Sequence, residues 1–262
     1  MTGGAAHFDL TGKRIWVAGH TGMVGSALVR RLEREAPAEI LTATHDALDL
    51  TDQAATRVWL DNARPDAVFV AAARVGGILA NQSYPADFLY DNLTIAANVI
   101  HAAHQVGVSR LLYLGSSSIY PKHADQPMAE DALLTGALEP THEGYAIAKI
   151  AGVKLCQAYR KQHGDDFIAA LPTNLYGPGD NYDLNTSHVI PALIRKVHEA
   201  KEAGADHVQI WGSGTPRREF LHADDCADAL VHLIKTYSGE APVNVGSGED
   251  LTIEALVRMI ME

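Results

Sequence analysis

The sequence has little cysteine and little positive charge. Its two cysteines, Cys156 and Cys226, have neither the paired spacing of a zinc site nor that of a disulfide framework. A formal net charge of -11 and the absence of clustered Lys and Arg argue against nucleic acid or an acidic membrane surface as a partner. The cysteine usage fits a reducing compartment, so we expect a cytoplasmic protein without a bound metal.

Long hydrophobic runs are also missing. The longest apolar run covers residues 67–73, which is too short to cross a bilayer. Residues 1–10 contain no basic region followed by an apolar stretch, as a secretory signal would. Hydrophobic residues make up 47% of the chain, which is sufficient for a sizeable core. We therefore expect a folded, soluble protein that is neither secreted nor membrane-bound.

Short apolar runs alternate with amphipathic stretches along the first two thirds of the chain. The expected strands cover 15–18, 40–43, 67–72, 111–114 and 167–171, and the expected helices cover 23–35, 54–62, 88–105 and 145–163. This alternation is typical of a parallel sheet with helices on both faces. We therefore predict an α/β fold, a Rossmann-type doubly wound parallel sheet, for residues 1–172, with residues 216–244 returning to it.

After Pro172 the pattern changes to loop signals. Glycine and proline cluster at 177–181 and at 211–216, on either side of an expected helix at 189–203. We predict that residues 173–215 and 245–262 form a smaller substrate-binding lobe over the carboxyl ends of the strands, where ligands lie in open α/β sheets. The sequence stops at Glu262 within an apparent helix, so this lobe is expected to be incomplete at its C-terminus.

Three glycines, Gly19, Gly22 and Gly25, fall between the first expected strand and the first expected helix. Glycine at this place permits a tight turn and a close approach of the backbone to a pyrophosphate at the helix N-terminus. The spacing G-x-x-G-x-x-G is less common than G-x-G-x-x-G and also occurs in ordinary turns. Its position after a strand is what predicts dinucleotide binding.

Tyr145 and Lys149 lie four residues apart, so one helix presents both on the same face. The lysine charge would lower the pKa of the tyrosine hydroxyl, which suits proton transfer to or from a carbonyl oxygen. Ser116 follows the strand at 111–114, at the carboxyl edge of the sheet. Each feature alone is common in helices or turns. Together, in this chain order, they predict a catalytic set.

These motifs resemble the extended short-chain dehydrogenases and reductases, and within them the GDP-L-fucose synthases. The segments that carry the resemblance are 18–26, 71–78, 84–88, 98–105, 115–122, 145–149, 172–178, 187–191 and 211–216. The resemblance implies an NADP(H)-dependent enzyme that epimerises GDP-4-keto-6-deoxy-D-mannose at C3 and C5 and reduces it at C4 to GDP-L-fucose. It also implies a homodimer formed through the helices at 88–105 and 145–163.

The resemblance also assigns roles to single residues. Tyr145, Lys149 and Ser116 match the reductive set, and His188 matches the epimerisation acid. The implied cofactor contacts are Gly19, Gly22, Met23, Val24, Gly25, Asp49, Leu50, Ala72, Lys149, Pro172, Asn174, Leu175 and His188. The implied contacts of the GDP-sugar are Asn174, Val189, Lys196, Trp211 and Arg218. Arg218 suits a diphosphate because its guanidinium can form paired, charge-assisted hydrogen bonds.

The chain departs from the family at the epimerisation base and at the contacts to the 2′-phosphate of the cofactor. The family's epimerisation base is a cysteine, and here that position is Ser118. A serine hydroxyl is far less acidic than a thiol, so proton abstraction needs a neighbouring base that the sequence does not identify. The basic residues that many members use for the 2′-phosphate of NADPH fall at Thr21 and His45, neither of which is a permanent cation. Asp49 does not settle NAD against NADP, and NADP(H) stays the expectation.

Other functions remain open at this stage. Because of Ser118, the chain could be a nucleotide-sugar 4-reductase or 4-epimerase without 3,5-epimerisation. A 4,6-dehydratase is disfavoured because residues 116–118 contain no carboxylate. A non-catalytic dinucleotide-binding module would have no need to keep Ser116, Tyr145 and Lys149 together.

Overall fold

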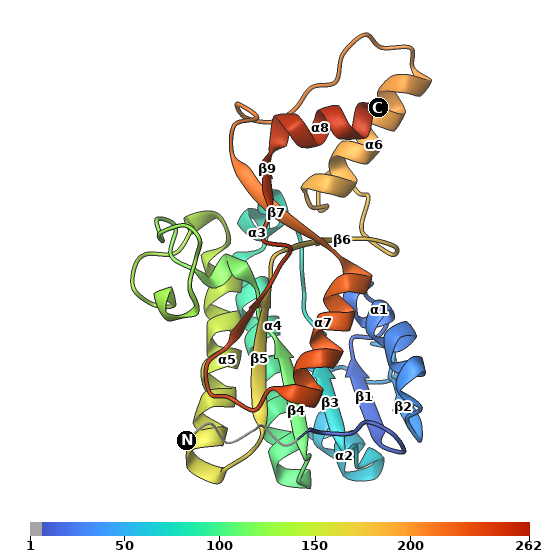
Figure 1. The fold of residues 1–262 in the computed structure, drawn as a ribbon, viewed down its shortest axis with the longest axis vertical. Helices are drawn as coiled ribbons and strands as arrows, with labels where there is room; N and C mark the ends of the chain where they lie inside the picture. The colour runs from blue at the N-terminus through green and yellow to red at the C-terminus, as the bar shows by residue number, and fades with distance from the viewer. Residues whose placement is uncertain (1–6) are drawn as a thin grey trace.

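The computed structural model describes residues 7–262. A large lobe contains one parallel sheet between two layers of helices, and a smaller lobe stands above the upper edge of that sheet (Figure 1). The chain enters the smaller lobe after β5, returns to the large lobe with α7, and ends in the smaller lobe (Figure 1).

The large sheet has six strands in the order β2-β1-β3-β4-β5-β8, and all neighbouring pairs are parallel. Its strands are β1 (Arg14–Ala18), β2 (Glu39–Leu41), β3 (Ala67–Val70), β4 (Arg110–Leu114), β5 (Phe167–Pro172) and β8 (Val243–Val245). Every residue of β3, β4 and β5 is buried, as expected for central strands covered on both faces. The predicted doubly wound sheet is therefore confirmed.

Helices cover both faces of this sheet. On one face α1 (Met23–Leu32) packs against α7 (Ala223–Thr236), and the other face carries α2 (Gln53–Ala63), α4 (Pro85–Val106) and α5 (Glu143–His163). The short helices are α3 (Ile78–Ser83) and the 3₁₀ turns η1 (Glu33–Glu35), η2 (Ser117–Ile119), η3 (Glu130–Ala132) and η4 (Pro140–His142). The four helices predicted in the first two thirds are confirmed. The first of these helices ends at Leu32, and the last turn that was expected for it is the separate 3₁₀ turn η1.

Local signals set the ends of the long helices. The α4 helix begins at Pro85, whose ring fixes a helical φ, and ends before Gly107 at φ +74°. Gly164 at φ +79° ends α5 in the same way, because glycine adopts the left-handed region without strain. The Asp52 carboxylate caps α2 by accepting the backbone N–H of Ala55 at 3.0 Å.

The smaller lobe combines a second sheet with two helices. Its strands, in the order β6-β7-β9, are β6 (Asn174–Tyr176), β7 (Arg217–His222) and β9 (Asp250–Thr252), and its helices are α6 (Val189–Glu202) and α8 (Ile253–Met261). Ile190 and Leu193 of α6 form its core with Leu256 and Val257 of α8.

The strand β7 corrects one expectation about domain organisation. Residues 216–244 were expected to return to the Rossmann domain, but β7 pairs with β6 and β9, and only α7 and β8 join the large lobe. The physical reason is that β7 begins with the exposed Arg217 and Arg218. It therefore lacks the continuous apolar run of a central parallel strand.

Within residues 7–262 no helix is both long enough and apolar enough to span a membrane. Cys156 on α5 and Cys226 on α7 are both buried as free thiols.

Candidate active site

The carboxyl ends of four parallel strands meet at the edge of the sheet that faces the smaller lobe. Gly19 follows β1, Ala72 follows β3, Ser116 follows β4, and Pro172 ends β5. These strands are neighbours in the sheet, so the residues that follow them share one edge, where ligands bind in this architecture.

The glycine turn between β1 and α1 has two packed glycines and one open glycine. A Cβ on Gly25 would lie 2.0 Å from the carbonyl oxygen of Gly19, and a Cβ on Gly19 would lie 2.6 Å from the Cα of Ala72. A Cβ on Gly22 would meet nothing closer than 3.5 Å, and no side chain caps α1 there. The free N–H groups of the first helical turn are thus open to a phosphate anion.

A ring nitrogen in the same turn, without a hydrogen-bond partner among the described residues, also indicates a site for a ligand there. Within residues 7–262 the ring Nδ1 of His20 is buried and has no hydrogen-bond partner. Gly179, in the loop after β6, approaches the Cα of Met23 at the start of α1. The loop of the smaller lobe thus comes close to the helix N-terminus, where the uncapped first turn of α1 and the unpartnered His20 nitrogen fit the phosphates of a dinucleotide.

Two glycine variants should separate folding from cofactor binding. We expect Gly25→Ala to lower the free energy of unfolding by about 1–3 kcal/mol, because its Cβ would overlap backbone atoms. Gly22→Ala should leave thermal unfolding nearly unchanged but weaken NADPH binding, since its methyl group would point into open space. The measurements are thermal denaturation and titration with NADPH. Tight NADPH binding by Gly22→Ala would place the pyrophosphate elsewhere.

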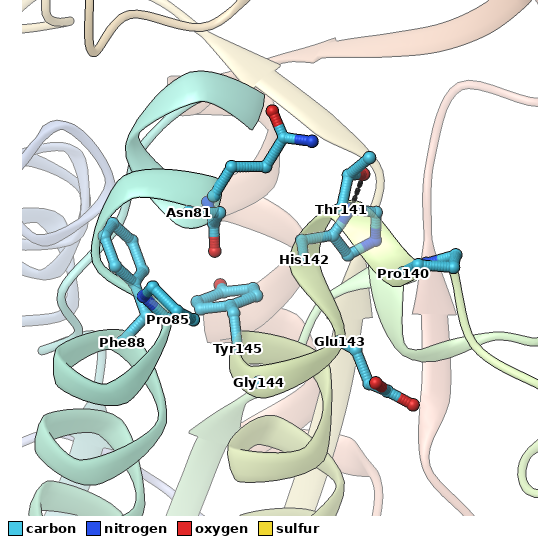
Figure 2. Close-up of a pocket in the computed structure, with 10 residues that line it drawn as sticks. Asn81, Pro85, Phe88, Pro140, Thr141, His142, Glu143, Gly144 and Tyr145 are labelled. Atoms are coloured by element: carbon cyan, nitrogen blue, oxygen red, sulfur yellow. Dashed lines mark hydrogen bonds between the residues drawn. The ribbon is translucent and has the colours of Figure 1, made fainter.

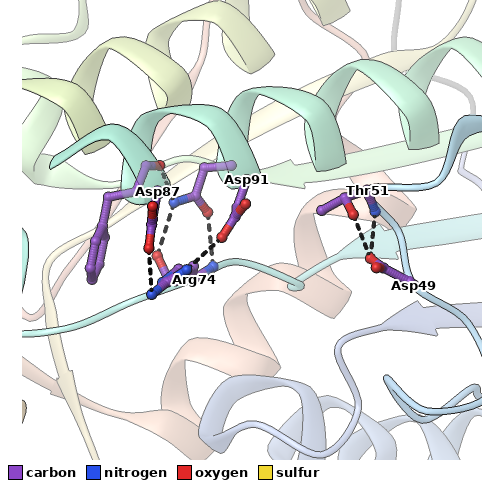
Figure 3. A network of polar contacts seen from close by, with 7 residues as sticks. Asp49, Thr51, Arg74, Asp87 and Asp91 are labelled. Atoms are coloured by element: carbon purple, nitrogen blue, oxygen red, sulfur yellow. Dashed lines mark hydrogen bonds and ion pairs between the residues drawn. The ribbon is translucent and has the colours of Figure 1, made fainter. Parts of the chain in front are cut away.

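The loop after β2 is held in place by two sets of hydrogen bonds. The Asp49 carboxylate accepts the backbone N–H of Thr51 at 2.9 Å and its hydroxyl at 2.7 Å (Figure 3), and these bonds lower the pKa of Asp49. The side-chain amide of Asn98 on α4 donates to the carbonyl oxygens of Leu50 and Thr51. Asp49 and Leu50 are thereby fixed beside the sheet edge, where the cofactor contacts are expected.

The loop after β3 is fixed by Arg74. Its guanidinium lies 3.1 Å from the Asp87 carboxylate and 2.8 Å from that of Asp91, both on α4 (Figure 3). The backbone N–H of Arg74 donates to the side chain of Asn92, whose amide donates back to the Arg74 carbonyl, both at 2.9 Å. This network joins the segment that contains Ala72 to the start of α4.

The predicted catalytic residues lie together at the start of α5 and the end of β4. Lys149 is 3% exposed, and its ammonium donates to the Leu114 carbonyl at 2.7 Å. Its Nζ lies 5.8 Å from the centre of the Tyr145 ring. The hydroxyls of Ser116 and Ser118 are 2.6 Å apart. The structure thus brings the four residues into one cluster.

Burial sets the proton affinities in this cluster. Burial raises the pKa of Tyr145 to about 12, against a smaller lowering by its hydrogen bond with Ser116, and burial lowers the pKa of Lys149 to about 7. The prediction that Lys149 lowers the pKa of Tyr145 is therefore wrong for this structure. The physical reason is that the low-dielectric interior disfavours both charged forms. Tyr145 is held as a phenol and is suited to donate a proton.

A cavity of about 370 Å³ adjoins this cluster. Asn81 of α3 and Phe88 of α4 lie on one side of it, and the segment from η4 to the first turn of α5 lies on the other (Figure 2). The second segment contributes His142 and Tyr145. The sequence pattern did not single out His142, although it stands three residues before Tyr145 at the start of the same helix, which was the available signal.

The remaining predicted residues lie on or next to the smaller lobe. His188 precedes α6, which begins with Val189, and Lys196 on α6 places its Nζ 5.0 Å from the centre of the Trp211 ring. The Asn174 amide donates to the Glu219 carbonyl at 3.0 Å, and Leu175 lies in β6. Trp211 is 69% exposed, and Arg218 on β7 is also exposed. Trp211 and Arg218 are therefore exposed on this lobe, whereas Asn174 and Lys196 already have contacts within it.

The segment before His188 is anchored to the large lobe. The N–H of Gly77 donates to the Thr186 carbonyl at 2.8 Å, so the loop after β3 touches the segment that leads into α6. Surrounding protein lowers the pKa of His188, while the nearby Asp180 carboxyl raises it. Because the His188 side chain remains exposed, solvent limits this lowering.

A dinucleotide turn at the same sheet edge as a tyrosine, a buried lysine and a serine is the arrangement of the short-chain dehydrogenases and reductases, and the chain is an enzyme of that class. It belongs to the NAD dependent epimerase/dehydratase family, whose model matches residues 15–246, and within that family to the GDP-L-fucose synthases.

Three comparisons with known proteins support this assignment. The chain is 59% identical to GDP-L-fucose synthase of Sinorhizobium fredii over 251 residues, which cover 96% of this chain and 80% of that protein. A GDP-L-fucose synthetase from Naegleria fowleri bound to NADP superposes with a TM-score of 0.89 at 28% identity, covering 97% and 79% of the two chains. A GDP-mannoheptose C4 reductase from Campylobacter jejuni with NADP bound superposes with a TM-score of 0.86 at 33% identity, covering 95% and 84%.

Proposed function

We propose that this enzyme epimerises GDP-4-keto-6-deoxy-D-mannose at C3 and C5 and reduces it at C4 to GDP-L-fucose, with NADPH as the reductant. The observation that carries the proposal is the cluster of Ser116, Tyr145 and Lys149 beside an open glycine turn. The identity to a GDP-L-fucose synthase over most of both chains supports the choice of substrate.

In this proposal each residue of the cluster has its own role in the reduction at C4. NADPH, when bound, supplies the hydride for C4. Tyr145 donates its phenolic proton to the C4 oxygen, and its raised pKa keeps that proton available at neutral pH. The Ser116 hydroxyl holds the same oxygen, and Lys149 positions the ribose next to the nicotinamide.

We propose that the nucleotide of the substrate binds to the smaller lobe. Arg218 would bind the diphosphate, Lys196 and Trp211 would hold the nucleotide, and Asn174 and Val189 would contact the sugar end. The Lys196 ammonium lies over the Trp211 indole ring, and Arg218 is exposed. Both observations support this assignment. In this proposal β6, β7, β9, α6 and α8 form the substrate lobe, and the elements around the six-stranded sheet form the cofactor domain.

The direct test is product analysis by NMR after incubation of GDP-4-keto-6-deoxy-D-mannose with NADPH and enzyme. GDP-L-fucose formed in proportion to NADPH oxidised is the expected result. The second candidate is a 4-reductase without epimerisation, which Ser118 and the likeness to a GDP-mannoheptose C4 reductase favour. It would yield a reduced GDP-6-deoxyhexose that is not GDP-L-fucose. Cofactor binding without turnover of any nucleotide sugar would leave a binding module.

The cofactor preference has its own test at Thr21, which is exposed in the glycine turn. We expect Thr21→Arg to raise the ratio of kcat/KM for NADPH over NADH about tenfold, the equivalent of ~1.4 kcal/mol, because a fixed cation would meet the 2′-phosphate. Steady-state kinetics with both cofactors measure this ratio. An unchanged ratio would place the 2′-phosphate away from Thr21.

Assembly and location complete the proposal. We propose a homodimer through α4 and α5, and the large exposed side chains Tyr90, Leu93 and Ile147 on these two helices support it. Light scattering after size exclusion measures the mass in solution. The two buried free thiols support a reducing compartment such as the cytoplasm.

A further inference from the structure

We infer that His142 is a catalytic residue of the epimerisation: it is the base that removes the C3 and C5 protons at a site where Ser118 cannot. The inference rests on the proposed function and identifies the missing base of that same site. It starts from the contact between the His142 imidazole and the backbone of Ser118.

The position of His142 connects the three parts of the site. Its ring is close enough to the Ser118 backbone and to the Arg218 guanidinium for both to influence its pKa. It lines the same cavity as Tyr145 (Figure 2). A sugar with its C4 oxygen at Tyr145 and its diphosphate at Arg218 must therefore pass beside His142.

A purely structural role leaves this ring unexplained. His142 occupies the N-cap position of α5, yet its side chain makes no capping hydrogen bond to the helix. Its Nδ1 lies 3.3 Å from the Thr141 hydroxyl, at the long end of hydrogen-bond distances. The Ser118 backbone raises the pKa of His142, as a carbonyl oxygen that faces a ring N–H would. A neutral ring that donates through one nitrogen keeps a lone pair on the other.

Burial of the ring, more than the charges around it, favours the neutral form of His142. Burial is the largest effect and lowers the pKa of His142 below its ordinary value. The Ser118 backbone and Glu139 raise this pKa by less than burial lowers it, and Arg218, the smallest effect, lowers it. The Glu139 carboxylate is itself paired with Lys122 at 3.0 Å, and Tyr145 is a neutral phenol. A diphosphate on Arg218 would offset that positive charge, so substrate binding would make the imidazole more basic.

The proton balance of the step is simple. The C–H bond at C3 or C5 breaks, its electron pair becomes the enolate of the C4 ketone, and the proton moves to the unprotonated nitrogen of His142. Ser116 and Tyr145 donate hydrogen bonds to the enolate oxygen. His188 returns a proton to the carbon, and exchange with solvent restores both histidines. Ser118 need not ionise at any point.

The test is deuterium incorporation into GDP-4-keto-6-deoxy-D-mannose in deuterated water without NADPH, followed by NMR at C3 and C5. We expect His142→Asn to slow incorporation by about 10²–10⁴-fold, the range of a lost general base. Oxidation of GDP-L-fucose by NADP⁺, which needs hydride transfer but no inversion, should be lowered far less. His207→Asn, which changes an exposed histidine of the smaller lobe, is the matched control and should change neither rate.

A second variant distinguishes a lost base from a collapsed pocket. In His142→Asn, the added change Ser118→Cys should restore incorporation, because a thiolate can take the same protons. The pH dependence of deuterium incorporation should change with the group that acts as the base. The unmodified protein should lose exchange only at acidic pH, below the ordinary titration of histidine, whereas the rescued variant should require pH near 8.5, about the pKa of a free thiol.

The outcomes separate the inference from the proposed function. Undiminished incorporation in His142→Asn, or no rescue by Ser118→Cys, overturns the inference while GDP-L-fucose oxidation upholds the proposed function. An unmodified protein that reduces the ketone without incorporating deuterium overturns the inference and establishes the 4-reductase. No hydride transfer with either GDP-sugar overturns the proposed function itself.

Discussion

Tyr145→Phe is expected to lower the rate of C4 reduction by about 10³-fold, within the range of a lost general acid. The substitution removes only the phenolic oxygen, so the ring still lines the cavity and the fold is retained. Single-turnover reduction of the keto sugar by NADPH measures the effect. The dissociation constant for NADPH should stay nearly unchanged, because the proton donor is removed without altering the cofactor site.

Tyr120→Phe is the matched control for this variant. Tyr120 is also a buried tyrosine, whose pKa burial raises to about 12, and it lies two residues beyond Ser118. Its hydroxyl donates to the Asn244 side chain at 2.6 Å and takes no part in the cluster. We expect Tyr120→Phe to keep reductase activity and to lose about 0.5–1.5 kcal/mol of stability. Normal turnover by Tyr145→Phe would refute the assignment of the proton donor.

Lys149→Met should stabilise the protein without cofactor while removing its activity. The Lys149 ammonium is buried at a cost that lowers its pKa from 10.5 to about 7, and methionine fills a similar volume without a charge. After allowance for the lost bond to the Leu114 carbonyl, we expect a gain of roughly 2–3 kcal/mol at neutral or lower pH. NADPH affinity and reduction should both fall, because the ribose contact is lost.

The pH dependence of that gain identifies its cause. The lysine pKa is lower in the folded chain than in the unfolded chain, so the cost of the buried charge is fully present below about pH 7. It disappears as the pH rises towards 10.5. Urea unfolding of both proteins across this range should therefore show the largest gain at low pH and no gain at high pH, where only the loss of the bond to the Leu114 carbonyl remains. A constant difference would mean that packing, not charge, explains the effect.

Local patterns in the sequence were enough to predict five strands of the large sheet, but not its edge strand β8. Strands such as β3 and β4 are continuous apolar runs, and the ends of α4 and α5 are marked by Pro85, Gly107 and Gly164. Strand β7 escaped this reasoning because its charged start gives no apolar signal. Its place depends on pairing with β6 and β9, which lie far away in sequence.

The sequence by itself determined the α/β class, the glycine turn and the spacing of Tyr145 and Lys149, because each follows from neighbours within a few residues. Only the tertiary structure decided the proton affinities of these two groups and the placement of His142 against Ser118. The reason is physical: a pKa depends on desolvation by chain segments that are distant in sequence. Ser118 follows β4 and His142 precedes α5, so the contact between them exists only when those two elements pack together.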